Sequence, residues 1–179
     1  TGRTATAISA GYGHSCALLD NGSVKCWGYG NSGELGQGST NDLGDEPGEM
    51  GDNLPAIDLG TGRTAVAIAN AYHSCALLDN GSVKCWGYDN SGALGQGSTN
   101  DLGDEPGEMG DNLPAIDLGT GRTATAISAG YGHSCALLDD SSLKCWGDNA
   151  RGQLGLGHKN YLGDEPGEMG DNLPAIDLG

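Results

Sequence analysis

The chain has 179 residues, of which 34 are Gly and none is Phe, and 24 acidic against 8 basic side chains give it a formal net charge of −16. Nucleic-acid binding needs clustered Lys and Arg, and anionic membrane surfaces attract basic segments, so this charge argues against both. No apolar run approaches the roughly 20 residues that span a bilayer. No signal peptide is recognisable, and because the chain begins at Thr1 we expect a processed or excerpted segment.

The sequence consists of three copies of one unit, at residues 1–60, 61–119 and 120–179. The same 18 residues, LGDEPGEMGDNLPAIDLG, end every unit. One unit has too few large apolar side chains for its own core, so we expect each to pack against its neighbours, as in repeat proteins. This periodicity argues against the disorder that a Gly-rich, acidic composition otherwise suggests. Gly179 has the phase of Gly60 and Gly119, which predicts an excerpt of a longer array or a building block that abuts copies of itself.

A strand and a hairpin are predicted at the start of each unit. In the first unit, TATAIS (Thr4–Ser9) alternates small polar and apolar residues, which is typical of a half-buried strand. HSCALL (His14–Leu19) and SVKCWG (Ser23–Gly28) flank a DNG turn sequence, and Asn-Gly favours a tight hairpin turn because Gly adopts a positive φ at little cost. The third unit has DDSS at residues 139–142, so we expect its turn to be looser or of a different type.

The end of each unit is predicted to add a fourth strand. In the first unit this strand is LPAIDLG (Leu54–Gly60), with Pro55 near its start, where the missing N–H group costs least. Four short strands per unit, separated by Gly-rich turns, predict an all-β fold of three four-stranded, propeller-type blades.

An acidic loop precedes the last segment of every unit. In the first unit Asp42, Asp45, Glu46, Glu49 and Asp52 fall within eleven residues. Oxygen-rich loops with interspersed Gly can wrap Ca²⁺, although this spacing is not that of an EF-hand. The alternatives are a solvated loop that keeps the protein soluble and protects sheet edges, and a surface for a basic protein partner. The candidate calcium ligands are Asp42, Asp45, Glu46, Asp101, Asp104, Glu105, Asp164 and Glu165.

Six cysteines form three pairs, each of which brackets one hairpin. The pairs are Cys16 with Cys26, Cys75 with Cys85, and Cys135 with Cys145. A turn with Gly in the left-handed region places Cys16 opposite Cys26, whereas a two-residue turn would put them on opposite faces. The even count, the identical spacing and the thin core favour three disulfides and an oxidising compartment. The alternatives are zinc bound by His14, Cys16 and Cys26, and buried free thiols.

Three other residue types recur in phase in the units. They are His14, His73 and His133; Trp27, Trp86 and Trp146; and Arg3, Arg63 and Arg122. We expect the histidines to be structural, because no hydroxyl nucleophile with a repeated acid partner accompanies them. The tryptophans are assigned to packing between blades, with a carbohydrate or peptide platform as the alternative. The arginines are expected to pair with acids of the adjoining unit.

The tyrosines and the third unit add two further expectations. Tyr12, Tyr72 and Tyr131 lie in Gly-rich turns, where we expect exposure, and Tyr29 and Tyr88 are expected on an exposed rim. The third unit departs from the others at residues 148–151 and 158–161. It is interpreted either as a specialised end of the array or as drift on a surface loop.

One long motif carries a family resemblance. HSCALLDNGSVKCWGYGNSGELGQG (His14–Gly38) recurs from His73 and, as HSCALLDDSSLKCWGDNARGQLGLG, from His133. It resembles the regulator of chromosome condensation repeat family and is most similar to the disulfide-containing bacterial branch. The resemblance covers all three units and implies four-stranded blades around an axis, commonly about seven to a ring. The nucleotide-exchange and chromatin roles of the founding member are not expected, because this chain lacks a basic surface.

Three blades leave two apolar blade faces open, and we expect these faces to be covered. The options are an open arc that closes with a second copy, part of a larger ring, or head-to-tail stacking into a filament. We therefore predict a non-catalytic extracellular or cell-surface protein that acts in structural assembly or adhesion as a homo-oligomer or homopolymer. The alternative is a closed-propeller binding module that recognises a protein or glycan ligand on one rim. No cofactor other than calcium, no nucleic-acid partner and no membrane insertion are expected.

Overall fold

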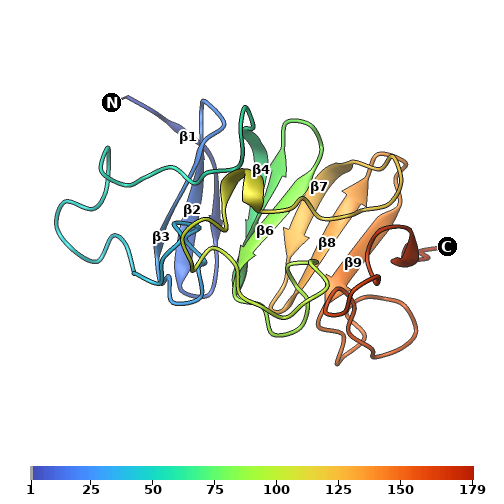
Figure 1. Cartoon of the computed structure of the whole chain (residues 1–179). Coiled ribbons are helices and arrows are strands. Elements are labelled where there is room, and N and C mark those ends of the chain that lie inside the picture. Colours follow the sequence, from blue (N-terminus) through green and yellow to red (C-terminus); the bar gives the residue numbers. More distant parts are fainter. Residues whose placement is uncertain (1) are drawn as a thin grey trace.

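The computed structural model describes residues 2–179 and contains three antiparallel three-stranded sheets that follow one another along the molecule (Figure 1). The strand order in each sheet is the order in the chain. The strands are β1 (Ala5–Ala10), β2 (His14–Leu19), β3 (Val24–Gly28), β4 (Ala65–Asn70), β5 (His73–Leu78), β6 (Val83–Gly87), β7 (Ala124–Ala129), β8 (His133–Leu138) and β9 (Leu143–Gly147). Two single-turn 3-10 helices, η1 (Gly110–Asn112) and η2 (Gly170–Asn172), complete the secondary structure of the described residues. The predicted all-β fold with propeller-type sheets is confirmed.

Turn chemistry sets the register of the β2–β3 hairpin. The Leu19 N–H donates to the Ser23 carbonyl and the Gly22 N–H donates to the Leu19 carbonyl, both at 2.9 Å, with Gly22 at a φ of 77°. This is the turn with a left-handed Gly that the DNG sequence favours. The register that follows places Cys16 opposite Cys26.

The third hairpin closes in the same way, so the prediction of a looser or different turn is wrong. The Leu138 N–H donates to the Ser142 carbonyl at 2.8 Å, and the Ser141 N–H donates to the Leu138 carbonyl at 3.0 Å. Ser141 takes the place of the turn Gly with a φ of 70°, and no other non-Gly residue in 2–179 has a positive φ. The left-handed backbone conformation of Ser141 therefore costs about 1 kcal/mol of stability, and the turn keeps the same type as in the first hairpin.

The predicted fourth strand does not form. Leu54–Gly60 has no regular secondary structure and makes one backbone hydrogen bond to the neighbouring strand, from the Ile57 N–H to the Val24 carbonyl at 2.8 Å. The other end of β3 pairs with the acidic loop instead, in an isolated bridge between Gly28 and Leu43. Pro55 can donate no ladder bond. The segment instead contributes buried apolar side chains to the core.

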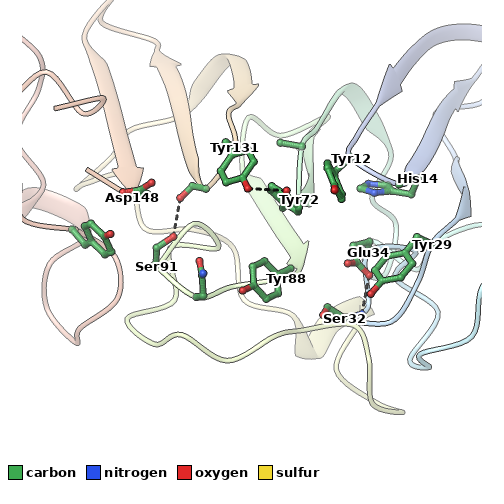
Figure 2. Close-up of a pocket in the computed structure, with 15 residues that line it drawn as sticks. Tyr12, His14, Tyr29, Ser32, Glu34, Tyr72, Tyr88, Ser91, Tyr131 and Asp148 are labelled. Carbon is green, nitrogen blue, oxygen red and sulfur yellow. Dashed lines mark hydrogen bonds between the residues drawn. The ribbon is translucent and has the colours of Figure 1, made fainter. Parts of the chain in front are cut away.

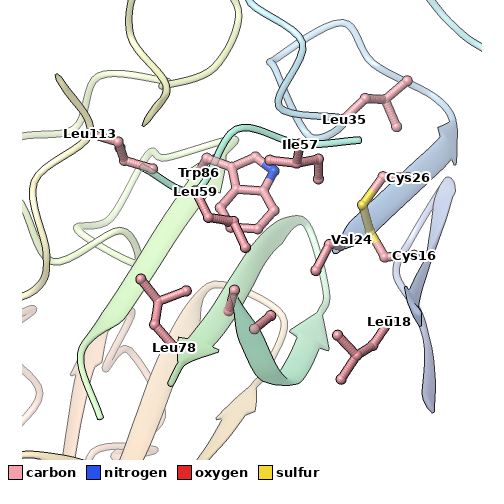
Figure 3. Close-up of a cluster of buried hydrophobic side chains, with 12 residues drawn as sticks. Cys16, Leu18, Val24, Cys26, Leu35, Ile57, Leu59, Leu78, Trp86 and Leu113 are labelled. Atoms are coloured by element: carbon pink, nitrogen blue, oxygen red, sulfur yellow. A yellow bond between two sulfur atoms is a disulfide. The ribbon is translucent and has the colours of Figure 1, made fainter. Parts of the chain in front are cut away.

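The hydrophobic core lies between the sheets and not within any one of them. In Figure 3 the Cys16–Cys26 disulfide, Leu18 and Val24 of the first sheet face Trp86 and Leu78 of the second. Ile57 and Leu59, from the segment that joins the two sheets, lie between them. A second cluster repeats this arrangement between the second and third sheets. Each core thus needs side chains from two successive units, as the thin composition of one unit predicts.

A tyrosine-lined groove as the candidate functional site

All six tyrosines of the chain line one groove of about 630 Å³. The groove lies along one rim, where the turns before β2, β5 and β8 meet the loops that follow β3, β6 and β9 (Figure 2). Because each unit repeats the same turn, each sheet places a tyrosine at the equivalent position on this rim. The tyrosines are Tyr12, Tyr29, Tyr72, Tyr88, Tyr131 and Tyr161. The predicted exposure is confirmed for Tyr12 and Tyr131, of whose surfaces 76% and 72% are exposed, but it is wrong for Tyr72, which is half-buried between their rings.

Tyr72 is the centre of this row. Its ring centroid lies 4.5 Å from that of Tyr12 and 4.3 Å from that of Tyr131, which it meets edge to face. The Tyr72 hydroxyl donates to the Tyr131 hydroxyl at 2.9 Å, and this hydrogen bond raises the pKa of Tyr72. A third ring, that of Tyr88, lies 6.1 Å away. The row therefore presents neutral phenols from all three units as one continuous aromatic surface.

A hydrogen-bonded chain between units holds the groove in place. The Ser74 hydroxyl donates to the Glu34 carbonyl at 2.9 Å, so His14 must donate its Nε2–H to Ser74 Oγ, 2.8 Å away. Trp86 Nε1 donates to the same Glu34 carbonyl at 3.0 Å. Burial lowers the pKa of His14 to about 4, which keeps the ring neutral at pH 7. The histidine is thus a link between sheets, which agrees with a structural role.

The second and third sheets repeat this chain with the corresponding residues. His73 Nε2 lies 2.7 Å from the Ser134 hydroxyl, which donates to the Ala93 carbonyl, and Trp146 Nε1 donates to that carbonyl at 3.0 Å. His133 would need a serine on a following sheet, and residues 2–179 contain no such sheet. The chain of bonds therefore ends at the third unit.

Two carboxylates flank the tyrosine row, and no Lys or Arg is among the lining residues. Glu34 is buried, and its Oε2 accepts a hydrogen bond from the Ser32 N–H at 2.9 Å. Burial raises the pKa of the Glu34 carboxyl. At the other side lies Asp148, whose Oδ1 accepts from the Ala150 N–H at 2.8 Å and whose charge raises the pKa of Tyr161.

The third unit exchanges a tyrosine and an acid. The first two units carry Tyr after the WG of β3 and β6 and Asp one residue before the bridging Leu, whereas the third carries Asp148 and Tyr161 at these positions. In the first unit that acid, Asp42, accepts from the Gly30 N–H at 2.8 Å. After the exchange both Asp148 and Tyr161 line the groove. The third unit thus keeps two tyrosines in the groove and adds a carboxylate.

The cysteines form three disulfides across the hairpins. The sulfur atoms are 1.91 Å apart in Cys16–Cys26 and 2.02 Å apart in each of the other two pairs, and all three Cα–Cα distances are 4.1 Å. Cα atoms this close fit directly opposed strand positions outside the hydrogen-bonded pairs. Disulfide sulfurs are not thiolate ligands, so the zinc alternative, with His14, Cys16 and Cys26, has no support in this geometry.

The acidic loops bond to their own backbone. Glu49 Oε2 accepts from the Gly44 N–H at 2.7 Å and from the Glu46 N–H at 3.2 Å, and these bonds lower the pKa of the Glu49 carboxyl. Glu108 and Glu168 repeat the pattern. Across residues 2–179, no three His, Cys, Asp or Glu side chains are grouped so that they could hold a metal ion. The candidate calcium ligands are therefore not brought together.

Two other expectations need correction. Trp86 and Trp146 are fully buried between successive sheets and donate to carbonyls of the preceding unit, which agrees with their assignment to packing between blades and leaves only the alternative of a ligand platform to be corrected. Arg3, Arg63 and Arg122 form ion pairs at 3.1–3.4 Å with acids of their own hairpins, and the expected pairing with the adjoining unit is wrong. The groove itself could have been found from the sequence only by noting that tyrosine recurs in phase on both sides of the hairpin.

Comparisons with known proteins agree with the repeat architecture. Profiles described as "Regulator of chromosome condensation (RCC1) repeat" match residues 5–34, 64–93 and 124–153, and also 80–137. The chain is 36% identical over 157 residues to the ultraviolet-B receptor UVR8 of Arabidopsis thaliana, which covers 87% of this chain and 32% of the relative. It is 30% identical over 155 residues to the human probable E3 ubiquitin-protein ligase HERC6, and this match covers 86% of this chain and 14% of the relative.

The crystal structure of Prp20p from Saccharomyces cerevisiae superposes with a TM-score of 0.68 at 20% identity, covering 97% of this chain and 38% of that one. This likeness supports the fold. The chain spans about a third or less of the length of the relatives it matches.

Proposed function

Because the chain belongs to the regulator of chromosome condensation (RCC1) repeat family, we propose that it is a non-catalytic propeller module that binds a protein ligand through the six-tyrosine groove. The observation that carries this proposal is that every tyrosine of the chain lines one rim, although the tyrosines come from six different loops and three units. Tyrosine combines a large rigid apolar surface with a polar tip, which is why it is enriched at the centres of protein interfaces.

The groove is prepared for binding before any ligand arrives. Its walls rest on sheets whose hairpins are cross-linked by disulfides and which are joined to one another by the His14–Ser74–Glu34 chain and by buried tryptophans. A preorganised aromatic surface loses little conformational freedom on binding, so more of the contact energy appears as affinity. Prp20p binds Gsp1p and histones, which supports protein recognition as a use of this fold. The HERC6 ligase matches over only 14% of its length, which gives no support for catalysis here.

The groove can be tested without a known ligand by selecting random twelve-residue peptides on the purified 179-residue protein. Selected peptides are expected to lose at least about tenfold in affinity on a Tyr72→Ala/Tyr131→Ala variant. The matched control is Ile8→Ser, a change of an exposed apolar residue on the outer face of β1, away from the groove, which should leave the affinity unchanged. Peptides that bind all three proteins alike, or no selection at all, would contradict the proposal.

Association through the two end faces is a second candidate, because apolar side chains that are covered inside the molecule are open at its ends. Leu137 on the outer face of the third sheet is 40% exposed, whereas its counterparts Leu18 and Leu77 are 5% and 4% exposed. Ile8 and Leu178 are each 80% exposed. A second copy, or further units of the same polypeptide, could cover these faces in an oligomer, a closed ring or a filament.

Sedimentation over a range of concentrations tests this candidate. Association predicts species larger than the 18.1 kDa chain, reduced by Ile8→Ser and retained by Tyr72→Ala/Tyr131→Ala. A monomer at every concentration would argue against self-association. The three disulfides favour a non-reducing compartment, such as the cell surface or the extracellular space, as the place where the protein acts.

A further inference from the structure

The charges of the six-tyrosine groove indicate which ligands it accepts. Its lining contains the carboxylates of Glu34 and Asp148, one at each side of the tyrosine row, and none of the eight basic side chains of the protein (Figure 2). The groove histidine, His14, adds no positive charge at pH 7, because burial lowers its pKa to about 4. The local field is therefore negative, and the net charge of −16 extends this field into solvent.

The aromatic rings, like the carboxylates, favour a positively charged ligand. The faces of Tyr rings are the negative ends of their quadrupoles, and they attract Lys and Arg side chains within about 6 Å of the ring centre. Tyr12 and Tyr131 remain largely exposed on either side of Tyr72, so their outer surfaces are open to a ligand. Carboxylates beside open tyrosine faces form a site for a cation that also has apolar parts.

The exchange in the third unit strengthens this pattern. Where the first two units place Tyr29 and Tyr88, the third places Asp148, and Tyr161 enters the groove from the following loop. The groove thereby gains a carboxylate without losing an aromatic side chain. Asp148 lies on the side of Tyr131, whereas Glu34 lies on the side of Tyr29, so the two acids are separated along the row.

We propose that the six-tyrosine groove binds an extended peptide segment that carries Arg or Lys side chains, with Glu34 and Asp148 facing the cations and the tyrosine row packing against the rest. This inference rests on the proposed function and specifies its ligand class. A segment with two basic residues fits the two separated acids. Nucleic acids, acidic peptides and anionic lipids would be repelled by the same charges.

Fluorescence anisotropy with labelled Gly-Ser decapeptides provides the test. One peptide carries two Arg residues, and two others carry Gln or Glu at the same places. The Arg peptide is expected to bind at least about tenfold more tightly than the Gln peptide at low ionic strength, with the difference shrinking as salt is added. The Glu peptide should show the weakest binding. Equal binding of the Arg and Gln peptides would overturn the inference.

Single substitutions separate the groove from the general charge of the protein. Glu34→Gln and Asp148→Asn keep the side-chain oxygens that accept the Ser32 and Ala150 N–H bonds, and each should weaken Arg-peptide binding about fivefold. The matched control is Glu46→Gln, which removes the same charge from an exposed loop outside the groove and should change affinity less than twofold. Equal losses in all three variants would mean diffuse attraction and would overturn the inference.

This outcome is distinguishable from a failure of the proposed function. The random library can yield peptides whose binding depends on Tyr72 and Tyr131 but which lack basic residues. Such peptides would support the groove as a binding site and would overturn its preference for Arg or Lys side chains. Loss of fold is checked by the thermal transition of each variant, which should stay within a few degrees of the parent protein.

Discussion

The middle and outer sheets of the molecule have nearly the same sequence and very different surroundings. Every residue of β5 and β6 is buried between two neighbours, whereas five of the six residues of β1 are exposed. Ile8 of β1 is 80% exposed, and its counterparts Ile68 and Ile127 are half-buried against the preceding sheet. The burial of a side chain is therefore set by its neighbouring unit and not by its own hairpin. Equal substitutions in equivalent positions should have unequal effects.

Tryptophan gives the largest expected difference. Trp86→Ala would leave a cavity between two sheets and remove a donor from the Glu34 carbonyl, so we expect a loss of about 3–5 kcal/mol in the free energy of unfolding. Trp27→Ala changes the same position in the first unit, where the side chain is only half-buried, and should cost less than half as much. Denaturant unfolding measures both. Equal costs would show that the neighbouring sheet does not set the contribution of the tryptophan.

Acid should destabilise the interfaces between sheets. Burial lowers the pKa of His14 and His73 to about 4 from an ordinary 6.5, so the unfolded chain takes up these protons before the folded protein does. Stability is therefore retained above pH 6.5 and falls as the pH decreases toward 4, by about 3 kcal/mol per histidine. Asp89 and Glu34 act in the opposite direction, because burial raises the pKa of Asp89 to about 6 and also raises that of Glu34, whereas the lowered pKa of His133 adds to the loss in acid.

Histidine variants sharpen this prediction. His73→Gln removes the most deeply buried ring, and the fall in stability between pH 6.5 and 4 should shrink by roughly half. His133→Gln should change the slope less, because its pKa is lowered by a weaker burial on a sheet with no follower in the described part of the chain. The exposed His158→Gln serves as the control. Thermal transitions recorded across this pH range decide the order, and an equal flattening by all three would contradict it.

Much of the fold could be predicted from the sequence, because its signals are local. The repeat gave the three units, the DNG turn gave the hairpin register, and the register brought Cys16 opposite Cys26. The segment Leu54–Gly60 could not be predicted correctly. Its apolar residues pack between two sheets, and their sequence pattern is the same as that of a strand. The pairing of Arg3 with Asp20 was also missed, because it depends on how the chain enters the hairpin.

The groove was beyond local signals for a related reason. Tyr12, Tyr72 and Tyr131 are about sixty residues apart, and their rings meet only because successive sheets stack in register. The sequence predicted that the tyrosines are exposed but not that they share one surface. Prediction of the site would have required the twist and spacing of the stacked sheets, which the sequence of one unit does not specify.

Lysine at equivalent positions provides an intermediate effect. The ammonium group of Lys84 is buried and donates to the Leu59 carbonyl at 3.1 Å and the Gly110 carbonyl at 2.7 Å. Lys84→Met keeps the apolar stem and leaves both carbonyls without this donor, at an expected cost of about 2 kcal/mol. Lys25, its counterpart, donates to the Gly51 carbonyl at the open edge of the first unit, and Lys25→Met should lower the free energy of unfolding by only a few tenths of a kcal/mol. Denaturant unfolding of the two variants would contradict the comparison if Lys25→Met were the more destabilising change.

The smallest expected change in stability comes from the turns of the second and third hairpins. Their surroundings explain why a serine is tolerated in only one of the two turns. A Cβ atom at Gly81 would lie 2.7 Å from Thr123 Cβ of the following sheet, whose Ala124 N–H donates to the Gly81 carbonyl. Ser141 occupies the equivalent place, and residues 2–179 contain no sheet that covers it. Ser141→Gly should therefore stabilise the protein by about 1 kcal/mol, because only the left-handed strain is removed.

The reverse substitution is the matched control, since Gly81→Ser adds both the strain and the contact with Thr123 and should destabilise by more than Ser141→Gly stabilises. Thermal unfolding measures both changes. The same contact bears on assembly, because a copy that covered the third sheet in the geometry of the internal interfaces would bring its threonine against Ser141. Ser141→Gly should then increase self-association in sedimentation, and an unchanged distribution would mean that the end faces meet other partners in a different geometry.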